Sequence, residues 1–457
     1  MNINHFQLPV SSSIRDCLEA INENKHGIIF IHDLSKVKKI IGVLTDGDIR
    51  DCLLKGAKID DKIKKHINKD FVYAEIDSPR EEILKRLDTN IKVIPILKKN
   101  KSLNDIANRD YIPNPSERSI FVRSRAPARI TFGGGGSDLT YFFTKEKGAV
   151  INATISIYSH ALLSLRNDNK IIVNSLDFNK KWTSNNLESA LKIKDKSFGL
   201  FKSLFMAINP NHGFELTVYS DFPKESGLGG SSVVYAAIIG CFNELRVDKW
   251  DSYDISEIAF QAERLHMKIA GGWQDQYATV FGGFNFIEFN KKNNSVHNLK
   301  IPKKIILEME ENLLLFEIPK KRIATGGDIH SNQKKTMETK KANTKMKEAV
   351  NLCYEIKEQL LRGNLEMFGK SLDKAWRLKR TFSKKISNKH IDAIYEHAIK
   401  NGAIGGKLMG AGGGGFFLFY VNPLLRSQLI TAMNKKGLKN TNFSFDKEGM
   451  QSWTIRQ

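Results

Sequence analysis

The stretch Pro223-Lys-Glu-Ser-Gly-Leu-Gly-Gly-Ser-Ser232 lies between the strand-like run Phe214–Tyr219 and the apolar run Val233–Leu245. This order predicts a strand, then a glycine loop, then a helix. Such a loop directs several free backbone N–H groups at one point, where the helix dipole also favours negative charge. The residues predicted to form this anion-binding loop are Pro223, Gly227, Leu228, Gly229, Gly230, Ser231 and Ser232.

The loop differs from the usual nucleotide P-loop. It does not read Gly-x-x-x-x-Gly-Lys-Ser/Thr, and no lysine stands at its end. A phosphate bound here would have to be handled by a serine hydroxyl and a metal ion. The alternative is a purely structural glycine turn in which Ser231 or Ser232 caps the helix N-terminus.

Two further glycine-rich segments flank the loop in sequence. Upstream, Arg125-Ala-Pro-Ala-Arg129-Ile-Thr-Phe-Gly-Gly-Gly-Gly-Ser-Asp138 joins a strand-like core to four glycines. These glycines would let a substrate approach the main chain closely, and Asp138 can accept hydrogen bonds from sugar hydroxyls. Downstream, Lys407-Leu-Met-Gly-Ala-Gly-Gly-Gly-Gly415 precedes the predicted strand Phe416–Tyr420. A flexible linker is the alternative for the upstream segment, but three segments joined to regular elements favour ligand binding.

Two carboxylates between these segments are candidates for phosphoryl-transfer chemistry. Glu263 lies in Ala259–His266, which has helical spacing, and Asp275 follows a glycine turn. A helix carboxylate can complete the ligand shell of Mg²⁺, and a second carboxylate can take the proton of an attacking hydroxyl. The alternatives are an ordinary ion pair of Glu263 with Arg264, His266 or a neighbouring lysine, and a turn or cap role for Asp275.

In this order, over roughly residues 119–457, the motifs resemble the GHMP kinase superfamily of small-molecule kinases. The segments ending at Asp138, around Asp275 and after Gly405 are similar to the D-glycero-D-manno-heptose 7-phosphate kinases. The resemblance implies a two-domain α+β fold, with residues 119–300 as the N-terminal kinase domain and residues 301–457 as the C-terminal one. It also implies transfer of the γ-phosphoryl group of ATP to the anomeric hydroxyl of a heptose 7-phosphate, giving the 1,7-bisphosphate for nucleotide-activated heptose. Alternatives are another sugar acceptor of fucose or mannose type, or a catalytically silent nucleotide-sensing protein.

The same resemblance implies roles for individual residues. Residues 223–232 would bind ATP, Ser231 and Glu263 would bind Mg²⁺, and Asp275 would be the catalytic base. Arg129 would support either the phosphoryl oxygens or the base. Gly230 stands where many relatives carry Ser or Thr, so Ser232 stays open as the metal ligand. The implied substrate-binding residues are Asp138, Gly135, Gly136, Arg322, Gly412 and Gly413. For Arg322, a solvated basic turn is the alternative.

The first part of the chain predicts an internal repeat. Its first copy contains a helix, two strands and a second helix, at Ser11–Asn24, Gly27–His32, Ile40–Leu44 and Asp46–Leu54. The weaker second copy has a helix, a strand and a short degenerate end, at Ser78–Leu87, Lys92–Leu97 and Leu103–Asn108. Pro113 and Pro115 mark residues 113–118 as a linker.

Through Ile41-Gly-Val-Leu-Thr45-Asp-Gly-Asp48, residues 1–112 resemble a pair of CBS motifs, a small α/β domain. This resemblance implies a regulatory nucleotide at Thr45 and Asp48. The second copy lacks a matching Thr-x-x-Asp. A structural or dimer-forming role, in a possible homodimer, is therefore the alternative.

Composition narrows the class of protein. The chain of 457 residues carries 71 Lys and Arg against 50 Asp and Glu, a net charge of +21. This excess suits either a solvated lysine-rich surface or a phosphorylated substrate, because the lysines are scattered without the interleaved aromatic residues of a nucleic-acid reader. Four distant cysteines favour a reduced cytoplasm and argue against zinc. The absence of a leader or long apolar run predicts a cytoplasmic protein that does not bind membranes.

Overall fold

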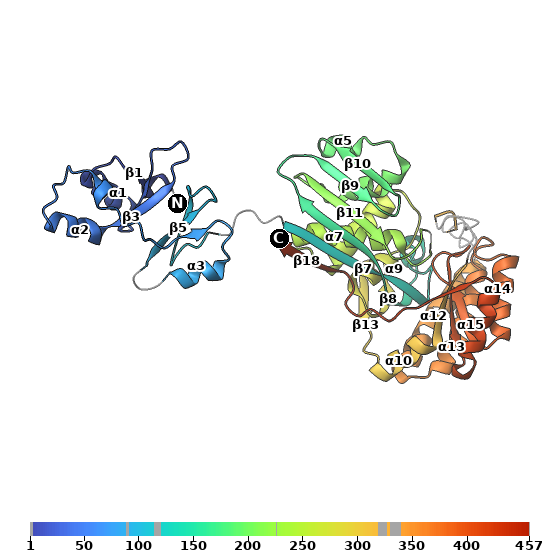
Figure 1. Ribbon diagram of the computed structural model, residues 1–457. Helices are drawn as coiled ribbons and strands as arrows, with labels where there is room; N and C mark the ends of the chain where they lie inside the picture. The colour runs from blue at the N-terminus through green and yellow to red at the C-terminus, as the bar shows by residue number, and fades with distance from the viewer. Residues whose placement is uncertain are drawn as a thin grey trace. The chain divides into compact units, whose positions relative to one another are not determined.

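The computed structural model describes residues 3–87, 91–113, 120–224, 226–318, 327–329 and 340–456. Two compact units make up the chain, Met1–Arg118 and Ser119–Gln457 (Figure 1). The largest hydrophobic core lies in the second unit, and the first unit contains smaller clusters of buried apolar residues.

The first unit contains the predicted internal repeat. One copy consists of β1 (Gln7–Pro9), α1 (Ile14–Asn24), β2 (Ile28–His32) and β3 (Ile40–Thr45), followed by α2 (Asp46–Leu54). The other copy consists of β4 (Ala74–Glu75), α3 (Arg80–Arg86), β5 (Val93–Leu97) and β6 (Leu103–Asn108). In each copy the first strand pairs parallel with the second, and the second pairs antiparallel with the third. Leu103–Asn108, expected as a short degenerate end, is a paired strand, and among the described residues no helix corresponding to α2 follows it.

Thr45 and Asp48, where a regulatory nucleotide was expected, hydrogen-bond to each other at the start of α2. The Thr45 hydroxyl donates to Asp48 Oδ2 over 2.7 Å, and the backbone N–H of Asp48 donates to Thr45 Oγ1 over 3.1 Å. The backbone N–H of Thr45 completes this capping box by donating to Asp48 Oδ2. These contacts explain the beginning of α2 without a ligand.

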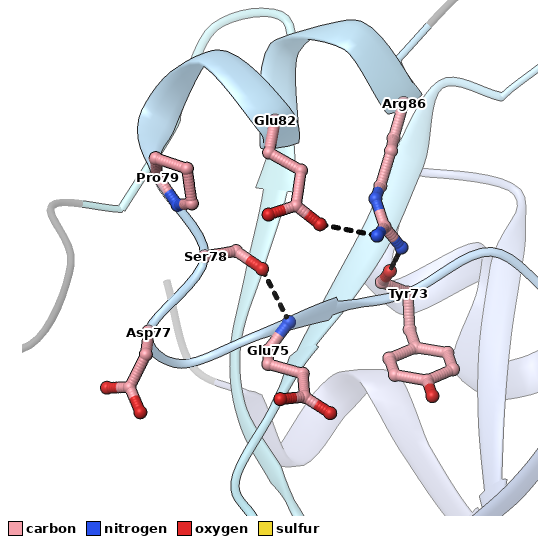
Figure 2. A pocket seen from close by; sticks show the side chains of 7 residues that line it. All are labelled: Tyr73, Glu75, Asp77, Ser78, Pro79, Glu82 and Arg86. Atoms are coloured by element: carbon pink, nitrogen blue, oxygen red, sulfur yellow. Dashed lines mark hydrogen bonds and ion pairs between the residues drawn. The ribbon is translucent and has the colours of Figure 1, made fainter.

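A pocket of about 330 Å³ lies in the second copy (Figure 2). Its lining residues are Tyr73, Glu75, Asp77, Ser78, Pro79, Glu82 and Arg86. Their polar groups are largely engaged within the unit: Arg86 pairs with Glu82, and Ser78 accepts a hydrogen bond from the backbone of Glu75. Lys101 also lies 3.4 Å from Glu75.

An eight-stranded sheet forms one layer of the second unit (Figure 1). Its strands are β7 (Ile120–Gly133), β8 (Gly148–Leu165), β9 (Ile171–Ser175), β10 (Lys180–Ser184), β11 (Phe214–Ser220), β12 (Phe284–Phe289), β13 (Asn294–Asn298) and β18 (Gln451–Arg456). All pair antiparallel except β9 with β11. Helix α7 (Gly230–Glu244) is buried along most of its length, as expected of a helix with apolar residues on all sides. It contacts β7 and β8 of the sheet, and it also contacts the helices α8 (Ser252–Phe260) and α9 (Gln274–Phe281).

The second unit also contains a four-stranded antiparallel sheet. Its order is β15 (Ala403–Leu408), β16 (Phe416–Val421), β14 (Leu313–Glu317) and β17 (Lys439–Thr441). The helices of this part are α10 (Lys303–Asn312), α12 (Lys340–Arg362), α13 (Leu365–Arg380), α14 (Lys389–Lys400) and α15 (Arg426–Lys435). The rings of Trp376 and Tyr395 pack on Phe417 in the core between this sheet and its helices.

The last strand does not stay with the expected C-terminal domain of residues 301–457. Strand β18 pairs antiparallel with β7, so that Trp453 lies opposite Arg123 in the first sheet. Strand β7 would otherwise be an exposed edge with unpaired backbone groups, and β18 covers it. A division of the kinase part at residue 300 therefore fails for Gln451–Arg456.

None of the helices among the described residues has both the length and the apolar character needed to cross a bilayer. The four cysteines, Cys17, Cys52, Cys241 and Cys353, are free thiols. Within the described ranges, no group of three or more His, Cys, Asp or Glu side chains is arranged to hold a metal ion.

Candidate active site

The loop between β11 and α7 presents the N-terminus of a buried helix of 15 residues. Helix α7 begins at Gly230, and its N-cap is Gly229 at φ 85°, a conformation that favours glycine. No described side chain caps this end, so the interpretation of Ser231 or Ser232 as the N-cap is wrong. Gly227 has a similar φ of 83°. The first turn of α7 therefore leaves backbone N–H groups for an anionic ligand.

Glu263 collects hydrogen bonds from three side chains. Ser231 Oγ donates to Glu263 Oε1, and Ser232 Oγ donates to Oε2 over 2.7 Å. Gln276 Nε2 also donates to Oε2, over 2.6 Å. The Arg264 guanidinium lies 3.3 Å from Oε1, so the ion pair considered as the alternative for Glu263 does form, alongside the contacts to the two serines.

The helix predicted over Ala259–His266 changes its winding where Glu263 lies. Helix α8 ends at Phe260 and continues as the π-helix η4 (Gln261–His266). The backbone N–H of Met267 bonds to the carbonyl of Ala262, five residues back. Such wide turns occur mostly as short insertions in α-helices and often accompany functional sites.

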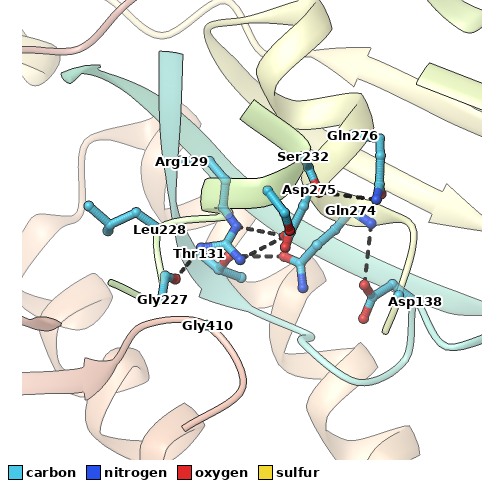
Figure 3. A network of polar contacts seen from close by, with 12 residues as sticks. Arg129, Thr131, Asp138, Gly227, Leu228, Ser232, Gln274, Asp275, Gln276 and Gly410 are labelled. Carbon is cyan, nitrogen blue, oxygen red and sulfur yellow. Dashed lines mark hydrogen bonds and ion pairs between the residues drawn. The ribbon is translucent and has the colours of Figure 1, made fainter. Parts of the chain in front are cut away.

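Arg129 joins the loop to Asp275 (Figure 3). Arg129 Nε donates to Asp275 Oδ1 over 2.8 Å, and Nη2 lies 2.7 Å from the same oxygen. Arg129 Nη1 donates to the carbonyl of Gly227 over 2.6 Å. The Arg129 side chain is 3% exposed and that of Asp275 is 19% exposed. The carboxylate of Asp275 is thus held by a buried cation while part of it is accessible.

Asp275 lies in the first turn of α9, one residue after the helix begins. The N-cap of this helix is Trp273, which makes no side-chain capping bond. The cap role considered for Asp275 is therefore wrong, and its carboxylate faces Arg129 instead.

Asp138 is buried against the start of the same helix. Its Oδ1 accepts from the backbone N–H of Gly136 over 2.8 Å, and its Oδ2 accepts from that of Gln274 over 3.3 Å. Burial raises the pKa of Asp138, and the negative charge of Asp275 raises it further. The neighbouring Gly135 is half-buried. The first glycine segment thus lies beside Asp275, as Figure 3 shows for Asp138.

The third glycine segment approaches the loop Pro223–Ser232 through the main chain. A Cβ atom on Gly410 would lie 2.6 Å from the carbonyl oxygen of Gly227, so only glycine permits this approach. Lys379 on α13 donates to the carbonyls of Leu408 and Gly410. Gly412 packs against Ile386, and the N–H of Gly413 donates to the Ile386 carbonyl over 2.9 Å. Arg322 lies outside the described residues.

Lys407 is buried between the second sheet and β7. Its Nζ donates to the carbonyl of Thr131 over 2.8 Å, and its side chain is 3% exposed. Burial lowers the pKa of Lys407 to about 7; the nearby Cys353 acts in the opposite direction, and the charge of Arg129 lowers it further. Lys407 therefore joins β15 to β7, the strand that carries Arg129.

A Lys407→Met variant is expected to change how stability depends on pH. The unfolded chain keeps the lysine proton up to about pH 10.5, whereas the folded protein releases it near pH 7. Between these values the unfolded state binds more protons, so wild-type stability rises with pH, by at most about 1.4 kcal/mol per pH unit from this group. The Met variant has no such titrating group, so its free energy of unfolding should exceed that of the wild type most at pH 7. Urea unfolding at pH 7, 8 and 9 should show this difference decreasing, by at most about 1.4 kcal/mol per pH unit. If the free energies of unfolding of the two proteins change with pH in the same way, the lowered pKa of Lys407 is wrong.

Several contacts in the site have no counterpart in the sequence-based prediction. Gln274 accepts a hydrogen bond from Thr131 Oγ1 over 2.9 Å, and Gln276 contacts Glu263. The signal for both was their position on either side of Asp275, as polar residues at the start of an apolar helix. Lys379 gave no such signal, because it stands among other basic residues of α13.

Comparisons with known proteins show the family of the chain. The family model for the GHMP kinases N terminal domain matches residues 190–283, and the model for the GHMP kinases C terminal domain matches residues 356–439. The D-glycero-alpha-D-manno-heptose 7-phosphate kinase of Campylobacter jejuni is 38% identical over 340 residues, covering 73% of this chain and 99% of that protein. The L-fucokinase/L-fucose-1-P guanylyltransferase of Bacteroides fragilis is 24% identical, covering 69% of this chain and 36% of that protein.

Solved structures show the same fold. The crystal structure of a D-glycero-D-manno-heptose 1-phosphate kinase from Bacteroides thetaiotaomicron superposes with a TM-score of 0.60 at 26% identity, covering 74% of this chain and all of that one. Lactococcus lactis galactokinase in complex with galactose gives a TM-score of 0.59 at 18% identity, covering 74% of this chain and 96% of that one. With the two family models and the long match at 38% identity, the chain belongs to the GHMP kinase family and is a sugar kinase, an ATP-dependent phosphotransferase.

Proposed function

We propose that the protein transfers the γ-phosphoryl group of ATP to the anomeric hydroxyl of D-glycero-D-manno-heptose 7-phosphate. The product is the 1,7-bisphosphate, which serves the synthesis of nucleotide-activated heptose. The observation that carries the reaction is the buried Arg129, which binds both Asp275 and the Gly227 carbonyl of the ATP loop. The choice of sugar is supported by the 38% identity to a heptose 7-phosphate kinase over nearly the whole of that protein.

In this reaction Asp275 is the base. Its carboxylate takes the proton of the anomeric hydroxyl as the sugar oxygen forms a bond to the γ-phosphorus, and the bond from that phosphorus to the bridging oxygen breaks to leave ADP. Arg129 keeps Asp275 oriented through two contacts to Oδ1 and places its positive charge beside the ATP loop. The N-terminus of α7 offers N–H groups and a favourable dipole to the nucleotide phosphates.

Ser231 and Glu263 fit a Mg²⁺ site. They bring a hydroxyl and a carboxylate oxygen together, and Mg²⁺ prefers such hard ligands, with water and substrate phosphates filling the other positions. Ser231 is the better candidate than Ser232, because Ser232 is fully buried and already contacts Glu263 and Gln276. Bound there, Mg²⁺ would neutralise charge on the phosphates.

Asp138 is proposed to bind sugar hydroxyls, together with Gly135 and Gly136. Both of its oxygens accept one backbone N–H each, and a carboxylate oxygen can accept a second bond. Arg322, Gly412 and Gly413 complete the proposed substrate site. The net charge of +21 favours encounter with a sugar that already carries phosphate.

For residues 1–112 we propose a CBS-pair-like module joined by the linker 113–118. The two β-α-β-β copies support this proposal. Because Thr45 and Asp48 already satisfy each other, a structural or dimer-forming role is favoured over binding of a regulatory nucleotide.

Phosphorus NMR of the purified protein with ATP, Mg²⁺ and a panel of sugars and sugar phosphates tests the proposal. We expect a new anomeric phosphate signal only with D-glycero-D-manno-heptose 7-phosphate. A signal with a fucose or mannose derivative instead would keep the mechanism and replace the substrate. Nucleotide binding without transfer to any sugar would overturn the proposed reaction.

A further inference from the structure

Three consecutive residues at the start of α9 contact three different parts of the site. The Gln274 side chain contacts Thr131, Asp275 contacts Arg129, and Gln276 contacts Ser232 (Figure 3). Gln276 also contacts Glu263. Successive side chains on a helix point about 100° apart, so three consecutive residues at one helix end can contact three different parts of the site. Helix α9 therefore connects the base to the pair of residues proposed to bind Mg²⁺.

The contacts of Gln276 are specific. Its Nε2 donates to Glu263 Oε2 over 2.6 Å and to Ser232 Oγ over 3.1 Å. The amide orientation follows from these contacts, because a flipped amide would place an acceptor against the carboxylate. Gln276 is fully buried, and its Oε1 has no hydrogen-bond partner among the described residues.

The unpartnered Oε1 atom means that packing alone does not explain a glutamine at position 276. An unsatisfied acceptor in a buried place lowers stability, whereas an apolar side chain of similar volume would avoid that cost. Of the neighbouring buried positions on α9, Ala278 and Val280 are apolar, and the hydroxyl of Thr279 is satisfied because it donates to the carbonyl of Pro127. The contact with Glu263 gives the reason for an amide at this position.

The two oxygens of Glu263 have different surroundings. Oε2 accepts from Ser232 and Gln276, whereas Oε1 meets Ser231 and Arg264. Ser231 is half-buried, so the Oε1 side of the carboxylate is the side nearer solvent. Because hydrogen bonds to Oε2 fix the plane of the carboxylate, they also fix the direction in which Oε1 points.

We propose that Gln276 is the positioning residue for the metal-binding carboxylate: it anchors Glu263 Oε2, so that Oε1 and the Ser231 hydroxyl are presented together to the divalent cation. This inference rests on the proposed metal site at Ser231 and Glu263. Gln276 acts through Glu263 and does not touch the reacting atoms.

Titration with Mn²⁺, followed by electron paramagnetic resonance in the presence of a non-hydrolysable ATP analogue, tests this role apart from turnover. Gln276→Met removes both donors at similar volume and is expected to weaken Mn²⁺ binding by about 10-fold or more. Affinity for the analogue without metal should change by less than about 2-fold, because Gln276 contacts only the Ser232 hydroxyl among the described loop residues and the backbone N–H groups at the start of α7 are unchanged. Gln276→Asn, which keeps an amide in the buried cluster but is one methylene shorter, should also weaken Mn²⁺ binding.

Two further variants make the outcome decisive. Gln428→Met, the same exchange at an exposed position of α15, should bind Mn²⁺ as the wild type does. Glu263→Gln should weaken Mn²⁺ binding if the proposed metal site is right. Wild-type Mn²⁺ affinity in folded Gln276→Met and Gln276→Asn, with a loss in Glu263→Gln, would overturn the role of Gln276. Wild-type affinity in Glu263→Gln would overturn the metal site itself.

Discussion

An Asp275→Asn variant is expected to lose at least about 100-fold in kcat, the lower range for removal of a general base. The asparagine amide has nearly the same shape but cannot take the proton of the sugar hydroxyl. Nucleotide affinity should stay close to the wild-type value, because Arg129 keeps its hydrogen bond to the Gly227 carbonyl and the N-terminus of α7 is unchanged. Steady-state kinetics and calorimetric titration with a non-hydrolysable ATP analogue measure the two effects separately.

The matched control is Asp248→Asn. Asp248 is paired with Arg246 at the surface, with its side chain 82% exposed, and it lies in the turn before α8. This exchange removes one carboxylate without touching the site, so kcat should stay within about 2-fold of the wild-type value. Wild-type-like turnover in Asp275→Asn would exclude Asp275 as the base and leave Arg129 with another role.

Gly134→Ala is expected to destabilise the fold by more than about 2 kcal/mol, in the range of substitutions that force strain into a packed core. Gly134 has φ 79°, a conformation that L side chains rarely adopt. A Cβ atom there would lie 1.9 Å from the carbonyl oxygen of Ala149 and 2.6 Å from Cys353 Sγ. The first obstacle is backbone of β8, so relief requires β7 and β8 to separate. Urea unfolding of the two proteins gives the difference directly.

The neighbouring glycine provides the comparison for this prediction. A Cβ atom on Gly135 would have Gln274 Nε2 as its nearest neighbour, at an ordinary contact distance of 3.6 Å. Gly135→Ala should therefore stay within about 0.5 kcal/mol of wild-type stability. Equal losses in both variants would show that flexibility of the whole glycine segment matters, and not the space at Gly134.

Local sequence patterns predicted the elements whose causes are local. Helix α2 begins and ends where it was expected, at Asp46 and Leu54, because Thr45 and Asp48 carry their own capping signal. The winding around Glu263 was missed, since helical spacing of apolar residues does not distinguish an α-turn from the π-helix η4. Strand β18 and its pairing with β7 were not predicted, because the local pattern of residues 451–456 carries no information about a distant neighbouring strand.

In the site, too, the residues with a local sequence signal were predicted, and the contacts between distant segments were not. Ser231, Glu263 and Asp275 were candidates from their local patterns, and the family resemblance implied their roles. The structure brings Ser231 to Glu263 and Arg129 to Asp275. The contacts of Lys407 and Gln276 depend on how distant segments pack. Thr131, for example, is 276 residues from Lys407 in sequence. Spacing along the chain carries no information about such pairs.

The pairing of β18 with β7 also means that the first sheet cannot be completed until the end of the chain has been synthesised. Ser124 on β7 donates to the backbone of Gln451, 327 residues later in the chain. At about 5 to 20 residues per second, the ribosome needs roughly 16 to 65 s to make the intervening chain. During this time β7 lacks the strand that covers its outer edge, although β8 is already available on the other side. Each newly made molecule therefore spends many seconds with an open sheet edge, which makes the yield of active kinase sensitive to the speed of translation and to chaperones that shield unpaired strands.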